Sequence, residues 1–124
     1  MIKKIDVGMA PSDAPVSDCV RVGRQVWLVA ISEDPATGEV VTGDIGVQTR
    51  QTLENLKRAI GAAGGSLADI VQVQVILTDK TDSAGMNSVY REYFAEPYPV
   101  RATVIAGLLA EGLKVEMLAT AVVG

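Results

Sequence analysis

The hydrophobic pattern changes its period in the middle of the chain, and this change constrains the fold more than any other sequence feature. From Gly46 to Ala63, apolar residues recur every three or four positions, which is typical of an amphipathic helix. Gly64 and Gly65 follow, and glycine readily adopts the left-handed conformation that ends many helices. From Val71 to Leu77, every second residue is valine or leucine, which is the period of a strand. The chain therefore combines helices with strands.

Turn-forming residues divide the rest of the chain into further short elements. A second helix is predicted from Asp82, its candidate cap, to Phe94, and Pro97 and Pro99 prevent its continuation. The segment Asp34–Glu39 is rich in turn formers and links two extended pieces. The run Val26–Ile31 contains no polar residue, which predicts a strand buried on both faces. Strands are predicted at Ile2–Val7, Val20–Val22, Val26–Ile31, Val100–Gly107 and Lys114–Val123.

This order of elements predicts one α+β domain that spans residues 1–124, with both helices packed on one face of a mixed β-sheet. The last two strands carry more apolar residues than one helix layer can cover. A homo-oligomer that packs sheet against sheet would bury the excess. The apolar residues in question are Leu108, Leu109, Met117, Leu118, Val122 and Val123.

Composition excludes several classes of function. The net charge of −4 is opposite in sign to the basic surface of nucleic-acid-binding proteins, so no nucleic-acid partner is expected. The chain has no histidine, and its single cysteine cannot form an internal disulfide or a zinc cage, so neither a metal nor another cofactor is expected. No apolar stretch is long enough for a membrane span or a signal peptide. We therefore expect a soluble, cytoplasmic protein without a membrane partner.

Two charged residues lie within otherwise apolar strands. Arg101 offers a planar guanidinium that fits a carboxylate with two parallel hydrogen bonds; the alternatives are a structural ion pair or an edge-strand position that reaches water. Glu116 lies between Val115 and Met117 and could pair with Arg101 or orient a water molecule. Its alternative is a solvent-facing position beside Lys114. Both residues are candidates for a site, and the residues alone leave these alternatives open.

Other side chains receive structural interpretations. Cys19 precedes an apolar strand and is predicted to be a small buried residue, because no histidine is present to activate its thiol. Trp27 is predicted to lie in the core. The glycines after the first helix do not form a phosphate-binding loop, because no Lys-Ser or Lys-Thr pair follows them.

Several segments resemble the RidA (YjgF) family of reactive-intermediate deaminases, and they occur in the family's order along nearly the whole chain. They are DPATGEVVTGDIGVQTRQTLENLKRAIGAAGGSLADIVQVQVILTD, MNSVYREYF, PVRATV and KVEMLATAVV. The resemblance implies a fold like that of trimeric bacterial chorismate mutase. It also implies a homotrimer with clefts between subunits that bind small 2-imino or 2-keto carboxylic acids.

The resemblance also assigns residues to the site. It places the carboxylate-binding arginine at Arg101 and the water-positioning glutamate at Glu116, while Asn87 matches a recurrent asparagine with an expected structural role. The backbone from Arg101 to Thr103, through Ala102, would orient the substrate nitrogen. Thr103 would belong to the catalytic group with Glu116.

Departures from the family pattern give a second hypothesis. Val16 stands where deaminating members have a tyrosine, and the segment around Ala30 lacks a glycine that brings backbone close to the ligand. The leading hypothesis is hydrolysis of small 2-imino or 2-enamino acids to 2-keto acids and ammonia. The alternative is a non-catalytic trimeric binder or sensor of small carboxylates.

Overall fold

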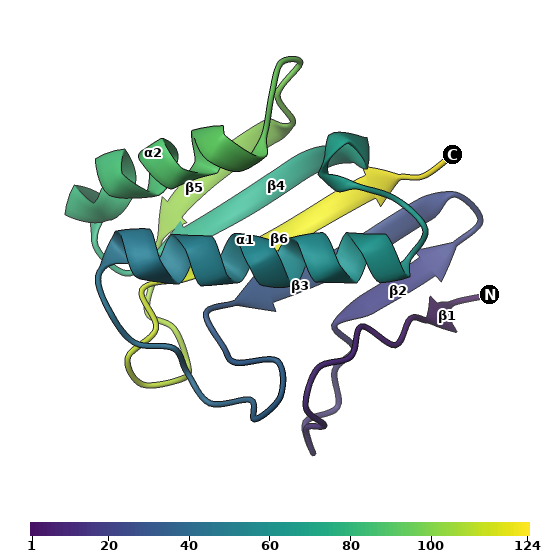
Figure 1. The fold of residues 1–124 in the computed structure, drawn as a ribbon, viewed down its shortest axis with the longest axis horizontal. Helices are drawn as coiled ribbons and strands as arrows, with labels where there is room; N and C mark the ends of the chain where they lie inside the picture. Colours follow the sequence, from purple (N-terminus) through teal and green to yellow (C-terminus); the bar gives the residue numbers. More distant parts are fainter.

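A computed structural model describes all residues of the chain, 1–124, as one six-stranded sheet with two α-helices on one face (Figure 1). The strands lie in the order β1-β2-β3-β6-β4-β5, so the last strand of the chain is near the centre of the sheet. The strands are β1 (Lys3–Lys4), β2 (Cys19–Val22), β3 (Gln25–Ile31), β4 (Ile70–Leu77), β5 (Val100–Ile105) and β6 (Val115–Val122).

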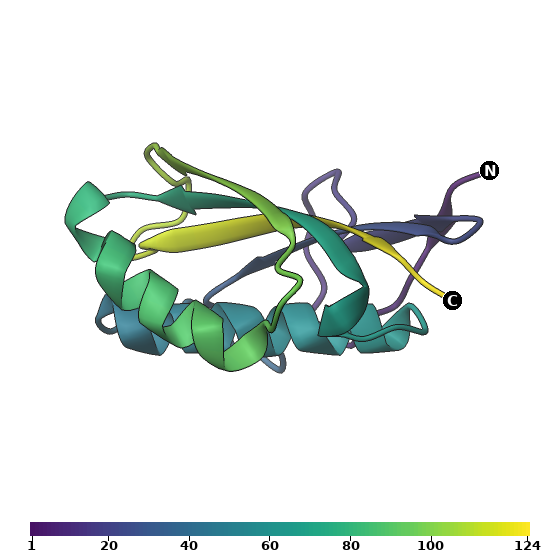
Figure 2. The same ribbon diagram turned by 90° about the horizontal axis from the view of Figure 1, so that it is seen from above.

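All neighbouring strands are antiparallel except β4 and β5, which are parallel. A parallel pair needs a crossover connection, and helix α2 (Ser83–Tyr93) supplies it between these two strands. Figure 2 shows both helices on the same side of the sheet and none on the other. The predicted mixed sheet backed by two helices on one face is therefore confirmed.

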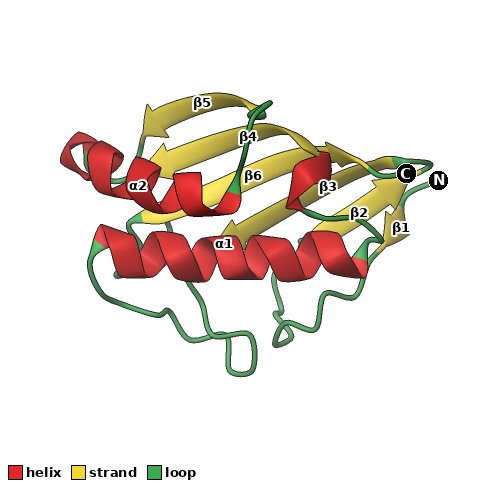
Figure 3. Ribbon diagram, turned by 45° about the horizontal axis from the view of Figure 1, so that its top comes forward, coloured by secondary structure: helices red, strands yellow, loops and turns green.

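Helix α1 (Ile45–Ala62) lies along β3 and β6 and agrees closely with the predicted range (Figure 3). The Asp44 carboxylate accepts a hydrogen bond of 2.9 Å from the Val47 amide and so begins the helix. Gly64 follows the helix with φ of +93°, a conformation that disfavours any side chain. Neither α1 nor α2 combines the length and hydropathy that a membrane-spanning helix requires.

Helix α2 begins directly after Asp82, as predicted. A short 3₁₀ turn (Lys80–Asp82) precedes it, and the Asp79 carboxylate caps that turn by accepting a 2.9 Å hydrogen bond from the Thr81 amide. Asp82 occupies the N-cap position of α2, as predicted, but its side chain makes no capping hydrogen bond. Two aspartates lie close together here, and the backbone geometry selects the first of them.

Strand β3 is buried on one face only, which corrects two predictions. Val26 and Leu28 point toward the helices and are buried, whereas Trp27 points the other way and is 38% exposed. The apolar run was interpreted as a strand covered on both faces, with Trp27 in the core. Because one chain supplies a single helix layer, the second face of this strand is uncovered.

Several strand bounds also differ from prediction; β5, for example, ends at Ile105 instead of Gly107. β1 contains only two residues instead of the predicted Ile2–Val7, and Gly8, with φ of +74°, then turns the chain away. In β4 a bulge lies between Ile70 and Gln72, so Val71 is exposed while Ile70 is buried. A bulge adds one residue and shifts the side-chain alternation at that point.

The sheet face away from the helices, called the open face below, carries many apolar side chains. In the middle of it, Leu118 of β6 lies opposite Val29 and Gln74 and is 50% exposed. Apolar side chains that are exposed together on one face favour an interaction surface there. The partly exposed apolar side chains on this face are Val22, Trp27, Val100, Val104, Leu118 and Val122.

Candidate active site

Arg101 is the second residue of the edge strand β5 and points toward the helices. It lies beside Val73, a fully buried residue of β4, so the two side chains share the helix side of the sheet. The guanidinium carbon is 4.7 Å from the ring centroid of Tyr90, and Nη1 is 4.0 Å from the sulfur of Met86. No carboxylate lies within 4 Å of it, so the structural ion pair considered above is absent.

Arg101 borders a hollow of about 400 Å³ between α2 and the start of β5, called the arginine pocket below. Its lining contains two guanidinium groups and no acidic side chain. Arginine in such surroundings favours anionic ligands, above all carboxylates. The lining residues are Asn87, Tyr90, Arg91, Tyr98, Pro99 and Arg101.

Tyr90 forms the floor beneath Arg101. Its side chain is 4% exposed and its ring stacks on Phe94, with 4.5 Å between the ring centroids. The hydroxyl lies near the Arg101 guanidinium but makes no well-formed hydrogen bond. Burial raises the pKa of this hydroxyl, and the charge of Arg101 acts in the opposite direction. The contact between Tyr90 and Arg101 was not predictable, because no local signal in the sequence shows which strand residue a helix side chain meets.

Glu116 is the second residue of β6 and points to the open face. Its neighbours across the sheet are Ile31 and Ile76, and its side chain is half-buried. The adjacent Val115 and Met117 are fully buried against the helices. Arg101 and Glu116 therefore lie on opposite faces of one sheet, and the pairing between them that the sequence allowed does not occur.

Ala102 and Thr103 follow Arg101 along β5 and lie on opposite faces. Ala102 is beside Gln74 on the open face, whereas Thr103 is beside Val75 on the helix side. Both side chains are exposed, because β5 has a neighbour on one edge only. The backbone of these residues is thus accessible from the free edge of the sheet.

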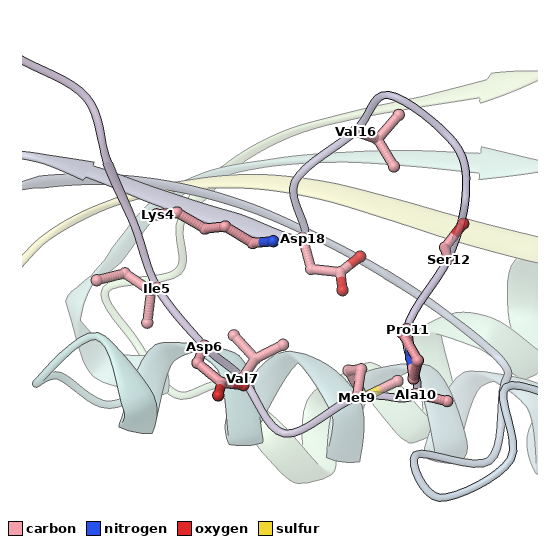
Figure 4. A pocket seen from close by; sticks show the side chains of 10 residues that line it. All are labelled: Lys4, Ile5, Asp6, Val7, Met9, Ala10, Pro11, Ser12, Val16 and Asp18. Atoms are coloured by element: carbon pink, nitrogen blue, oxygen red, sulfur yellow. The ribbon is translucent and has the colours of Figure 1, made fainter.

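Val16 and Ala30 lie on other strands or loops than Arg101; Ala30, on β3, is the sheet partner of Met117 and so lies close to Glu116. Val16 is 66% exposed in the loop between β1 and β2, which is at the other edge of the sheet from β5. Figure 4 shows it at the crest of that loop, beside a hollow of about 430 Å³ into which Lys4 and Asp18 extend. The Ala30 side chain is buried in the core against the helices.

Comparison with known proteins identifies the family. A family model described as Endoribonuclease L-PSP matches residues 8–123. The crystal structure of RidA from the Antarctic bacterium Psychrobacter sp. PAMC 21119 superposes with a TM-score of 0.90 at 35% identity, over 98% of this chain and 99% of that one. The chain belongs to the RidA family. The resemblance seen in the sequence is thereby confirmed.

Two relatives of this RidA-family chain carry different names. A RutC family protein of Pyrococcus horikoshii is 44% identical over 108 residues, which are 86% of each chain. The 2-iminobutanoate/2-iminopropanoate deaminase of Bos taurus is 34% identical over 124 residues, covering 98% of this chain and 90% of the bovine one. Imine deamination is thus the named activity of some members of the family.

The single cysteine of this RidA-family protein, Cys19, is placed where its thiol is unreactive. Cys19 is 1% exposed and packs in the core, as predicted. Burial raises the pKa of its thiol, and the Asp18 carboxylate raises it further, so the thiol stays protonated at neutral pH. No three His, Cys, Asp or Glu side chains converge on a point where they could hold a metal ion.

Proposed function

We propose that this RidA-family chain hydrolyses small 2-imino and 2-enamino acids to 2-keto acids and ammonia in the cytoplasm. The observation that carries the proposal is the guanidinium of Arg101, which has no carboxylate partner and borders a pocket without acidic residues. The family's arginine for the substrate carboxylate matches this position, and the bovine relative is named for this activity.

The reaction suits a chain without histidine. An iminium carbon is already electrophilic, so the protein needs to hold the substrate and align a water molecule. Arg101 binds the carboxylate, and backbone groups from Ala102 to Thr103 meet the substrate nitrogen. Glu116 accepts a proton from water as its oxygen attacks the imine carbon, and returns it to the nitrogen. The carbon–nitrogen bond of the resulting carbinolamine then breaks while its hydroxyl group loses its proton to solvent, which gives ammonia and the 2-keto acid.

This scheme needs two copies of the chain. Arg101 faces the helices at the β5 edge, whereas Glu116 faces the open side of the sheet. A water aligned by Glu116 reaches a substrate on Arg101 only if the two residues come from different subunits. We therefore propose a homotrimer in which the open face is covered by neighbouring subunits, so that each cleft combines Arg101 of one chain with Glu116 of another.

The test generates 2-iminobutanoate enzymatically and follows the release of 2-ketobutyrate with and without the protein. Arg101→Ala is expected to lose both binding of 2-ketobutyrate and turnover. Glu116→Gln keeps the size of the side chain but cannot accept a proton, so binding persists while turnover falls by about a hundredfold or more. Unchanged turnover in Glu116→Gln would rule out its proposed role.

The alternative function is a trimeric binder of small carboxylates that does not catalyse. Val16 favours it, because an exposed valine cannot supply the hydrogen bond of the family tyrosine at this position. Ala30 favours it as well, because its side chain points into the core while the family glycine brings backbone close to the ligand. Binding of 2-keto acids through Arg101 without acceleration of any imine hydrolysis would establish this alternative.

An RNA-cleaving activity, which the description of the family model suggests, has less support from this chain. The net charge is −4, and single-stranded RNA is usually held by basic grooves with aromatic stacking platforms. The arginine pocket holds only two cationic groups, enough for a small anion. A ribonuclease assay on unstructured RNA with Arg101→Ala as control tests this activity.

A further inference from the structure

The arginine pocket contains a second cation to which the proposed reaction gives no role. Arg91, on the third turn of α2, borders the same hollow as Arg101. It comes from the helix, whereas Arg101 comes from the strand, so the pocket has a positive group on each of two walls. A ligand with one carboxylate pairs with Arg101 and leaves Arg91 unpaired.

No acidic side chain of the chain forms an ion pair with Arg91. Its neighbour Glu92 is engaged by Arg50, whose Nη2 lies 2.9 Å from the Glu92 carboxylate in the only ion pair of the chain. No acidic residue lines the pocket. Two uncompensated cations beside one hollow raise the local concentration of anions and favour ligands of higher negative charge.

The rest of the pocket suits a polar ligand. Asn87 is one helical turn before Arg91 and offers an amide to the same hollow. Tyr90 lines it as well, and its buried hydroxyl has no hydrogen-bond partner. A buried hydroxyl without a hydrogen-bond partner is unfavourable. A ligand that hydrogen-bonds to the Tyr90 hydroxyl, or a movement of Arg101 that does so, is therefore favoured.

Resting on the function proposed above, we infer that this pocket prefers 2-imino and 2-keto acids that carry a second carboxylate. The 2-carboxylate binds Arg101 and the distal carboxylate binds Arg91. Arg91 is exposed, and ion pairs of exposed side chains are weak. The expected gain in affinity over a monocarboxylate is therefore modest, about fivefold at low salt.

Calorimetry on the assembled protein tests the preference with three ligands. They are 2-ketobutyrate, 2-ketoglutarate and 2-ketohexanoate, a monocarboxylate of similar length to 2-ketoglutarate. The wild type is expected to bind 2-ketoglutarate about fivefold more tightly than 2-ketohexanoate. Arg91→Gln is expected to abolish that difference, and 2-ketobutyrate is expected to lose less affinity than 2-ketoglutarate, because it has no second carboxylate to pair with Arg91.

Matched variants separate the two proposals. Arg58→Gln removes an equal charge from α1, on a different hollow, and is expected to keep the preference. The wild type could bind 2-ketoglutarate and 2-ketohexanoate with equal affinity, while Arg101→Ala binds neither. That result would overturn the inference about the second carboxylate and leave the proposed function standing. If Arg91→Gln lowers the affinity for all three ligands by the same factor, the inference about the second carboxylate is overturned as well. If Arg101→Ala leaves every affinity unchanged, the carboxylate anchor itself is wrong, and the proposed function fails with it.

Discussion

The guanidinium carbon of Arg101 lies 4.7 Å from the centre of the Tyr90 ring, so the candidate anchor for a carboxylate rests on an aromatic face. A cation over an aromatic ring is stabilised by the ring quadrupole, and the flat ring also limits how the guanidinium tilts. The ring is itself fixed, because it stacks on Phe94 and is almost fully buried. The position of Arg101 is thus determined by the packing of α2.

Substitution of Tyr90 separates the ring from its hydroxyl. Tyr90→Leu removes the aromatic face and is expected to weaken 2-ketobutyrate binding about fivefold, as loss of a cation–π contact of roughly 1 kcal/mol implies. Tyr90→Phe keeps the ring and removes a hydroxyl that has no partner, so the free protein is expected to be at least as stable as the wild type. Calorimetry and urea unfolding measure the two effects. Equal affinities in the Leu and Phe variants would contradict the role of the ring.

A charge at the centre of the open face is expected to block assembly. Leu118→Glu places a carboxylate where we propose that another subunit packs, and burial of an unpaired charge is strongly unfavourable. Sedimentation is expected to give three times 13.0 kDa for the wild type and a single chain for the variant. Val47→Glu, at an exposed valine on α1, is the matched control and is expected to assemble. A wild type that stays monomeric at micromolar concentration would remove the intersubunit site.

Gln48 fixes the segment that leads into β6. Its Nε2 donates to the Gly112 carbonyl at 2.8 Å, and its Oε1 accepts from the Lys114 amide at 2.8 Å. Gln48→Leu leaves both groups without partners, and the expected loss of stability is about 2 kcal/mol or more. Because Lys114 precedes Glu116 by two residues, keto-acid release is expected to fall as well. Urea unfolding at fixed protein concentration, with Lys57→Leu on the exposed side of α1 as control, measures the difference.

Glu33 makes stability depend on pH. Burial raises the pKa of its carboxyl above the ordinary 4.5, and the Asp18 carboxylate raises it further. The folded state therefore holds this proton more tightly than the unfolded state, and stability falls as pH rises from about 4.5 through the raised value. The free energy of unfolding of Glu33→Gln is expected to equal that of the wild type at pH 3.5 and to be higher than that of the wild type at pH 7. Glu39→Gln, in the same loop, is the control; a difference between Glu33→Gln and wild type that does not change with pH contradicts the prediction.

The elements with strong periodicity were predictable from the sequence. Helix α1, strand β6 and the end of β4 lie within one or two residues of their predicted bounds, because apolar spacing reports directly which residues a layer buries. The bulge in β4 and the turn before α2 were not predictable. The bulge depends on the pairing of β4 with β6, which local sequence does not encode. The turn depends on which of two nearby aspartates, Asp79 or Asp82, makes the capping hydrogen bond, and both are equally suited to it by residue type.

The faces of the two site residues were predictable to different degrees. In β6, the apolar residues Val115 and Met117 point to the buried face. Because side chains alternate along a strand, Glu116 between them points to the opposite face. The sequence around Arg101, VRATVI, has no such alternation, because an edge strand buries little of either face. Its direction follows from the pairing with β4 and the packing of α2.

The strand order gives the two halves of the proposed site different local stabilities. β6, which carries Glu116, is hydrogen-bonded to β3 on one side and to β4 on the other, whereas β5, which carries Arg101, is bonded to β4 alone. Amide hydrogens of a central strand exchange with solvent only when much of the sheet opens, while an edge strand can detach alone. A ligand on Arg101 is therefore expected to slow deuterium uptake mainly in β5, whereas the backbone that carries Glu116, the proposed water-positioning residue, stays paired whether or not the site is filled.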